Sequence, residues 1–135
     1  MAGLSWPAKR VLIVRHAEAA PGTPDELRAL TPAGREQARI LGETLRASGF
    51  SADAVVTSPF LRARETADAL ALARPAVDER LAPGATPDDL RQAAAGRGET
   101  VVLVGHQPDC SQAFAAFTGG PEPPFPPCGH ALVEL

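Results

Sequence analysis

Two arginines and two histidines stand at or just after the ends of apolar runs, where their side chains could do chemistry. Arg15 and His16 end one such run, His106 follows a second, and Arg62 comes shortly after a third. An arginine presents a planar fork of N–H donors that matches phosphate oxygens. A neutral imidazole nitrogen can attack phosphorus in line while positive groups stabilise the equatorial oxygens. Together these residue types indicate a site that binds and transfers a phosphoryl group.

The apolar runs that precede these residues have the pattern of β-strands buried on both faces. We expect strands over residues 11–14, 52–58 and 100–106, a brief strand near Val77 and a final strand over 130–135. Helices are expected over residues 31–49, from Ser58 and Pro59 onward, over 86–96 and over 107–120. This alternation predicts an α/β fold, a three-layer sandwich with a mostly parallel central sheet and helices on both faces.

The carboxyl ends of parallel strands meet at one edge of a sheet, where α/β proteins gather their functional groups. We therefore expect Arg15, His16 and His106 to lie close together at that edge. Arg62 should belong to the first turn of the helix after the second strand, where backbone N–H groups also favour an anion. Separate strand ends that carry the same chemistry indicate a phosphate pocket more strongly than any one of them alone.

The composition describes a chain of 135 residues with 44% hydrophobic residues and a formal net charge of -3. This length suits one domain over residues 1–135, with residues 1–10 as a flexible lead-in. The negative net charge gives no overall positive potential that would attract nucleic acid. No apolar stretch approaches the roughly 20 residues of a membrane span. Cys110 and Cys128 form no CxxC or Cys/His cluster. We expect a cytoplasmic monomer without a cofactor or a metal.

Other polar residues of the chain have plainer interpretations. His130 stands in the last predicted strand and is interpreted as structural. Arg64 and Glu65, beside Arg62, are expected to be solvated. For Glu18 a local salt bridge is favoured over a catalytic role.

Several segments resemble signature segments of the histidine phosphatase superfamily. They are "LIVRHAEA" (12–19), "SPFLRARETA" (58–67) and "VLVGHQP" (102–108), with "LTPAGREQA" (30–38) between the first two. They span most of the chain in the expected order. Within the superfamily the chain is most similar to the small SixA-type phosphohistidine phosphatases, through its short length, "SPFLRA" and the stretch "LAPGATPDDL" (81–90). The resemblance implies the fold described above.

The resemblance also implies roles for the residues at the strand ends. His16 would be the nucleophile that becomes phosphorylated, and Arg15, Arg62 and His106 would bind and stabilise the phosphoryl group. No cofactor is implied.

The segment "PDELRALT" (24–31) resembles the stretch that SixA-type members carry just before their first helix. By this resemblance Arg28 could bind substrate and Asp25 could serve as the proton donor. An ion pair within the loop is an equally good interpretation of the two residues. Ala17 stands where the superfamily usually has glycine, a position that varies among SixA-type members.

The chain departs from the larger phosphatases and mutases of the superfamily, which carry a glutamate proton donor after the second motif. That region reads "RLAPGA" here, with Pro83 where such a glutamate would stand. The segment from Thr66 to Glu99 is also too short for a substantial lid. Both features favour a P–N substrate, because an imidazole needs less acid assistance to leave than an alkoxide. They favour dephosphorylation of phosphohistidine on a signalling or phosphotransfer protein.

Three other functions remain open from the sequence. The chain could hydrolyse a small phosphomonoester by the same mechanism, or bind phosphate without turnover. It could also be a metallohydrolase that uses His16 and His106 with Glu18 or Asp109. The spacing of those ligands fits no familiar metal motif, and the arginines would repel a cation.

Overall fold

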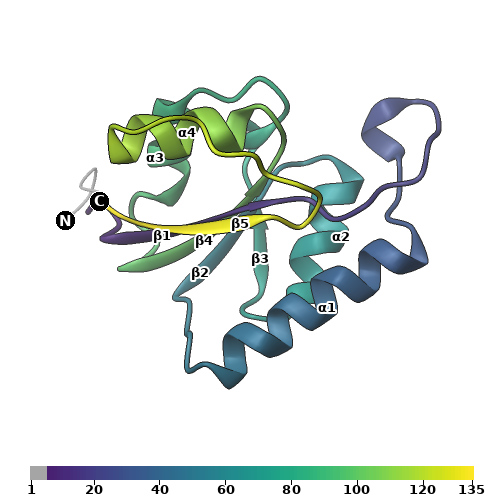
Figure 1. The fold of residues 1–135 in the computed structure, drawn as a ribbon, viewed down its shortest axis with the longest axis horizontal. Helices are drawn as coiled ribbons and strands as arrows, with labels where there is room; N and C mark the ends of the chain where they lie inside the picture. The colour runs from purple at the N-terminus through teal and green to yellow at the C-terminus, as the bar shows by residue number, and fades with distance from the viewer. Residues whose placement is uncertain (1–5) are drawn as a thin grey trace.

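The computed structural model describes residues 6–135, which form a five-stranded sheet with helices on both faces (Figure 1). The strands are β1 (Arg10–Arg15), β2 (Ala54–Thr57), β3 (Pro75–Val77), β4 (Thr100–Gly105) and β5 (His130–Glu134). Their order across the sheet is β3-β2-β4-β1-β5. All neighbouring pairs are parallel except β1 and β5, which are antiparallel. The mostly parallel sheet confirms the predicted α/β architecture.

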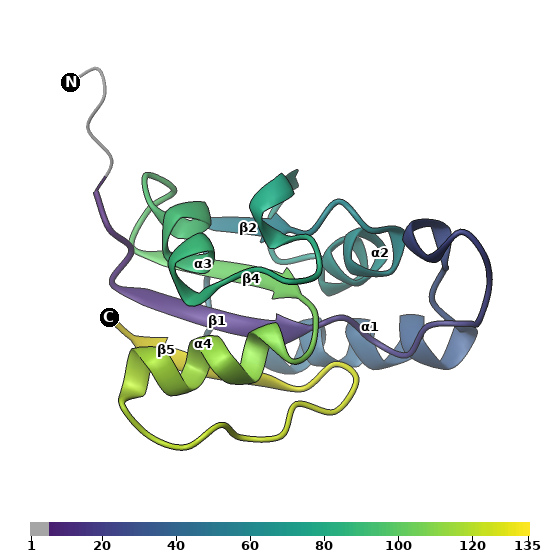
Figure 2. The same ribbon diagram turned by 90° about the horizontal axis from the view of Figure 1, so that it is seen from above.

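Two pairs of helices make the outer layers. They are α1 (Pro32–Ala47) and α2 (Leu61–Leu70) on one face, and α3 (Pro87–Ala94) and α4 (Asp109–Thr118) on the other (Figures 1 and 2). The side chains of successive residues in β1 point alternately to the two faces of the sheet. Val11 and Ile13 pack in the core beneath α3 and α4, whereas Leu12 and Val14 pack in the core beneath α1 and α2. A continuous apolar run is therefore needed, since both faces of the strand are covered.

The helix after β2 begins later than the sequence predicts. The sequence predicts a start at Ser58 and Pro59, but α2 starts at Leu61. The Ser58 hydroxyl oxygen accepts a hydrogen bond from the Phe60 amide at 3.2 Å, which favours a turn before the helix. The later start still leaves Arg62 in the first turn. Similarly, α4 occupies Asp109–Thr118 within the predicted range 107–120.

The described part of the chain before β1 packs against the rest of the domain. Ala8 is buried, and the Trp6 carbonyl accepts a hydrogen bond from the Gly96 amide at 2.8 Å. Residues 1–5 of the predicted lead-in lie outside the described residues. Among the helices of residues 6–135, none is long and apolar enough to cross a membrane.

Candidate active site

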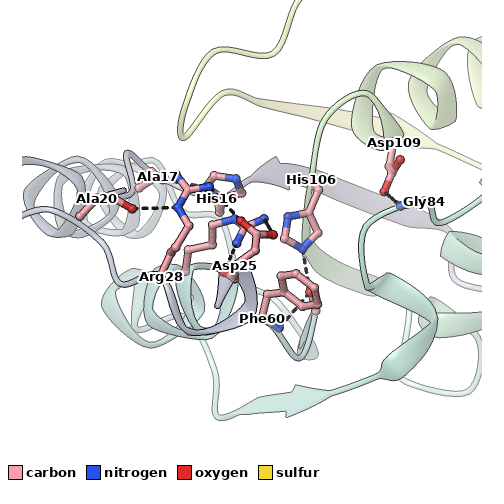
Figure 3. Close-up of polar contacts among 11 residues, drawn as sticks. His16, Ala17, Ala20, Asp25, Arg28, Phe60, Gly84, His106 and Asp109 are labelled. Carbon is pink, nitrogen blue, oxygen red and sulfur yellow. Dashed lines mark hydrogen bonds and ion pairs between the residues drawn. The ribbon is translucent and has the colours of Figure 1, made fainter. Parts of the chain in front are cut away.

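The parallel pairing of β1 and β4 brings the two histidines together. Arg15 lies in register with Gly105, so His16 and His106 leave their strands side by side at the carboxyl edge of the sheet (Figure 3). Their ring centroids are 5.4 Å apart and the ring planes are tilted by 57°. The structure thus brings together the residues that the sequence places at these strand ends.

His16 is held in the tautomer that a nucleophile needs. Its Nδ1 lies 2.8 Å from the Ala17 carbonyl oxygen, which can only accept, so Nδ1 carries the proton and Nε2 keeps its lone pair. Burial lowers the pKa of His16 to about 4 despite this hydrogen bond, and the charges of Arg62 and Arg15 act in the same direction as burial. The ring is therefore neutral near pH 7, with Nε2 able to attack an electrophile.

His106 is the more deeply buried of the two rings, with 3% of its surface exposed. Its Nε2 lies 2.8 Å from the Ser58 hydroxyl oxygen, and the ring of Phe60 contacts it edge-on at a centroid distance of 5.3 Å. Burial, followed by the neighbouring His16 and Arg62, lowers the pKa of His106 to about 3. Ser58 and Phe60 were not singled out as site residues from the sequence, although both belong to the segment "SPFLRA" after β2.

The charges of Arg62 and Arg15 act on both imidazoles, and each guanidinium is held by a hydrogen bond to a backbone carbonyl. Arg15 donates from Nη1 to the Phe125 carbonyl at 2.9 Å. Arg62 lies 5.1 Å from the centroid of the Phe60 ring and donates from Nη1 to the Asp25 carbonyl at 2.9 Å. The Nε atoms of both arginines are buried and have no partner within residues 6–135. Two oriented cations beside two neutral imidazoles can hold an anion such as a phosphoryl group.

Asp25 begins a short 3-10 turn (Asp25–Leu27), and Arg28 is the residue that ends it. Figure 3 shows both side chains on the same side of the sheet edge as His16. The Asp25 carboxylate accepts from Arg28 at 3.1 Å and from Arg62 at 3.2 Å. The hydrogen bond from Arg28, followed by that from Arg62, lowers the pKa of Asp25. An ionised carboxylate has no proton to give, so the geometry favours the ion-pair interpretation. The roles of Asp25 as proton donor and of Arg28 as substrate ligand stay predictions.

The expectation that Glu65 is solvated is wrong. Its carboxylate accepts from the Leu30 amide at 2.8 Å and from Arg35 at 2.8 Å, and it ties α2 to the start of α1. Arg64 is exposed, as expected. Glu18 accepts a hydrogen bond from the Thr31 hydroxyl, and it takes part in no ion pair with the described residues 6–135.

His130 begins β5 and is exposed. Asp109, which the sequence offered as a metal ligand, is buried and engaged by the backbone. Its carboxylate accepts from the amides of Gly84 and Ala85 at 2.9 and 3.1 Å, and burial raises its pKa. These bonds fasten the segment "RLAPGA" beside the turn that carries His106 (Figure 3). Across residues 6–135, no group of three or more His, Cys, Asp or Glu side chains could hold a metal ion.

Sequence comparison places these residues in a known family. The family model described as the histidine phosphatase superfamily (branch 1) matches residues 11–83, which include Arg15, His16 and Arg62. An uncharacterized protein of Picosynechococcus is 36% identical over 112 residues, a match that covers 77% of this chain and 68% of that protein. The mitochondrial serine/threonine-protein phosphatase Pgam5 of Drosophila willistoni is 40% identical over 62 residues. That match covers 45% of this chain and 21% of Pgam5.

Solved structures share the whole fold. The protein histidine phosphatase SixA, determined in complex with tungstate, superimposes with a TM-score of 0.80 and is 26% identical in sequence. The superposition covers 93% of this chain and 88% of that chain. The two chains therefore share nearly all of the α/β fold.

Proposed function

The chain belongs to the histidine phosphatase superfamily, and from this premise we propose that it hydrolyses phosphoryl groups through a covalent intermediate on His16. The observation that carries the proposal is the neutral His16 ring, whose Nε2 is free because Nδ1 is bonded to the Ala17 carbonyl. The His106 ring lies 5.4 Å from the His16 ring, and the charges of Arg62 and Arg15 act on His16, so these three residues are the candidates for binding phosphoryl oxygens.

The reaction takes two displacements at phosphorus. In the first, His16 Nε2 forms a P–N bond as the bond to the leaving group breaks, while Arg15 and Arg62 stabilise the equatorial oxygens. In the second, a water attacks the phosphorylated His16, and the P–N bond electrons return to Nε2. The proton of the water ends on the released phosphate. The histidine is regenerated neutral, in the protonation state that its lowered pKa favours.

The preferred substrate in this proposal is phosphohistidine on a signalling or phosphotransfer protein. A phosphorylated imidazole that carries a proton on its other nitrogen leaves as a neutral ring, so the enzyme need not supply a strong acid. This fits a site where Asp109 fastens "RLAPGA", with Pro83 in place of a glutamate, next to the His106 turn. The similarity to a protein histidine phosphatase supports the same substrate class.

The intermediate is tested by trapping it. Brief incubation with a labelled phosphohistidine protein and quenching in alkali should leave label on the wild-type chain, and acid should remove it. His16→Ala should trap no label and lose turnover, whereas His130→Ala, which removes an exposed histidine, should behave as wild type. Turnover at the wild-type rate by folded His16→Ala would refute the mechanism.

The substrate class is tested by comparing kcat/KM for a phosphohistidine-bearing phosphotransfer domain with that for a phosphoserine peptide and several small esters. The proposal expects the phosphohistidine protein to be preferred. If a small ester were turned over as efficiently, the chain would be a phosphomonoesterase of the same mechanism. Binding of phosphate without any turnover would instead indicate a phosphate-binding module.

Independence from metal ions, a monomeric state and a cytoplasmic location also belong to this proposal. Arg62, Arg15 and Arg28 supply positive charge near His16, so turnover should survive exhaustive chelation. Loss of activity on chelation, restored by zinc or manganese, would favour the metallohydrolase. Sedimentation across a range of protein concentrations tests the monomer.

A further inference from the structure

The chain returns from α4 to β5 through a proline-rich strap (residues 121–129), which runs along the β5 side of the molecule (Figure 2). The sequence predicts only irregular structure for "PEPPFPP" within it. We infer that this strap is a positioning device, which holds the Arg15 guanidinium and the His16 backbone in the geometry that phosphoryl binding requires. The inference rests on the proposed function in one respect, that Arg15 binds the phosphoryl group.

The strap contacts the end of β1 through three hydrogen bonds. Arg15 donates from Nη1 to the Phe125 carbonyl at 2.9 Å, and its backbone amide donates to the Gly129 carbonyl at 2.9 Å. The Cys128 amide donates to the His16 carbonyl at 3.0 Å. The strap therefore fixes both the side chain of Arg15 and the backbone on either side of the Arg15–His16 peptide.

The other end of the strap is bonded to the turn that carries His106. The Gln107 side chain, next to His106, donates to the Ser111 hydroxyl at 2.7 Å and accepts from the Ser111 amide at 3.0 Å. The Ser111 hydroxyl in turn donates to the Pro123 carbonyl. A continuous set of hydrogen bonds and covalent links thus joins the His106 turn to Arg15 through the strap.

The Phe125 side chain anchors the strap. Its ring is 5% exposed and packs in the same core cluster as Ile13, Leu103 and Cys110. Prolines at 123, 124, 126 and 127 flank it, and each fixes its own φ, which reduces the conformations open to the strap. A buried ring between stiff neighbours sets the direction of the Phe125 carbonyl, the atom that Arg15 contacts.

Gly129 makes the turn at the end of the strap possible. Its amide donates to the Pro126 carbonyl at 2.7 Å, and a Cβ at this position would lie 2.8 Å from the same oxygen. A side chain at this position would displace the backbone that receives the Arg15 amide. Phe125, Ser111 and Gly129 are therefore positioning residues, which act on the phosphoryl group through Arg15 and His16.

Two variants test the inference with tungstate, an oxyanion probe that needs no turnover. Ser111→Ala breaks the bond to the strap, and Phe125→Leu loosens its anchor. Each should weaken tungstate binding about tenfold, since misplacing a binding group by about 1 Å can cost as much as 10²-fold. NMR titration, which reaches millimolar affinities, measures this in the wild type and in an Arg15→Ala background. In that background the two strap substitutions should have a much smaller effect, because the guanidinium that they position is gone and only the His16 backbone is left for the strap to hold.

Val101→Ala provides the control for general destabilisation. Val101 is fully buried in the same core cluster but lies near the amino end of β4, away from the site. It should lower the melting temperature and leave tungstate affinity unchanged. The inference would be overturned if both strap variants bound tungstate with wild-type affinity. It would also be overturned if they lost the same factor in tungstate affinity in the wild-type and Arg15→Ala backgrounds. Tungstate binding does not depend on catalysis, so this result can be interpreted even if no intermediate is trapped on His16.

Discussion

Burial and fixed positive charge act in the same direction on the two imidazoles of the site. Both effects disfavour the protonated ring, and they lower the pKa of His16 to about 4 and that of His106 to about 3. A dianionic phosphoryl group would reverse the charge effect when it binds. The free protein therefore presents a neutral His16 ring, as the proposed nucleophile requires, and a bound phosphoryl group should make a proton on His106 more favourable.

The protonation states can be measured directly. NMR titration of the histidine ring protons should show His16 and His106 neutral from pH 8 down to below pH 5, with midpoints near 4 and 3. Added tungstate should raise both midpoints, because it places negative charge beside the rings. A midpoint near 6.5 for either ring in the free protein would contradict the described burial.

Arg62 offers a test of guanidinium geometry against charge alone. Arg62→Lys keeps the positive charge but loses the planar fork. We expect kcat to fall by about 10²–10³, the usual effect of removing one well-placed electrostatic contact. Arg64→Lys is the matched control, since Arg64 is exposed on the same helix. Equal kcat in both variants would place Arg62 outside the catalytic machinery.

At the scale of elements, the residue types and the spacing of apolar residues along the sequence account for what could be predicted. The apolar runs predicted β1, β2 and β4, and the carboxyl-edge rule predicted the meeting of His16 with His106. The contact of Arg15 with the strap could not be predicted, because its acceptor is a backbone carbonyl, which every residue carries. The hydrogen bonds of Glu65 could not be predicted either, because its partners, Leu30 and Arg35, are distant in the sequence.

Where α1 packs against α2, helix propensity and steric fit predict opposite effects of one substitution on stability. Gly42 lies on the buried side of α1, where a Cβ would come within 2.1 Å of the Leu70 carbonyl oxygen. Propensity alone would make Gly42→Ala stabilising by about 1 kcal/mol. We expect it to lower the melting temperature instead, because backbone must move. Thr44→Ala, at an exposed position of the same helix, should raise it slightly. A melting temperature raised in both variants would show that α1 can shift freely.

At the scale of the whole molecule, the sheet separates two large apolar cores, and the polar site lies at the carboxyl edge of the sheet, in contact with apolar residues. Leu70, Val55 and Val102 fill one side, and Ile13, Leu81 and Leu103 fill the other. His106 and Arg62 are nevertheless buried at 3% and 6% exposure. The burial of titratable groups such as His106 couples the stability of the fold to pH.

The direction of that coupling follows from the pKa values. The folded pKa of His16, about 4, and of His106, about 3, lie below the ordinary imidazole value of 6.5. Between these values the unfolded chain binds more protons, so acid favours unfolding. Stability from the neutral rings is fully present above about pH 6.5 and is lost as the pH falls toward the folded values. Asp109 has the opposite effect on stability, because its pKa is raised in the folded protein and acid therefore favours folding there. The pKa of Asp25 is lowered in the folded protein, so its contribution to stability is lost only as the pH falls below about 3.8.

Calorimetry between pH 7.5 and 4.5 measures this loss as a falling melting temperature. His16→Gln and His106→Gln each remove one imidazole that the unfolded chain would protonate, so each should lose less melting temperature over that range than the wild type. His130→Ala controls for removal of a histidine away from the site. Saturating tungstate should raise the melting temperature, because the anion binds only the folded site. If the melting temperatures of both glutamine variants fell as steeply with pH as that of the wild type, the acid sensitivity would originate outside the two imidazoles.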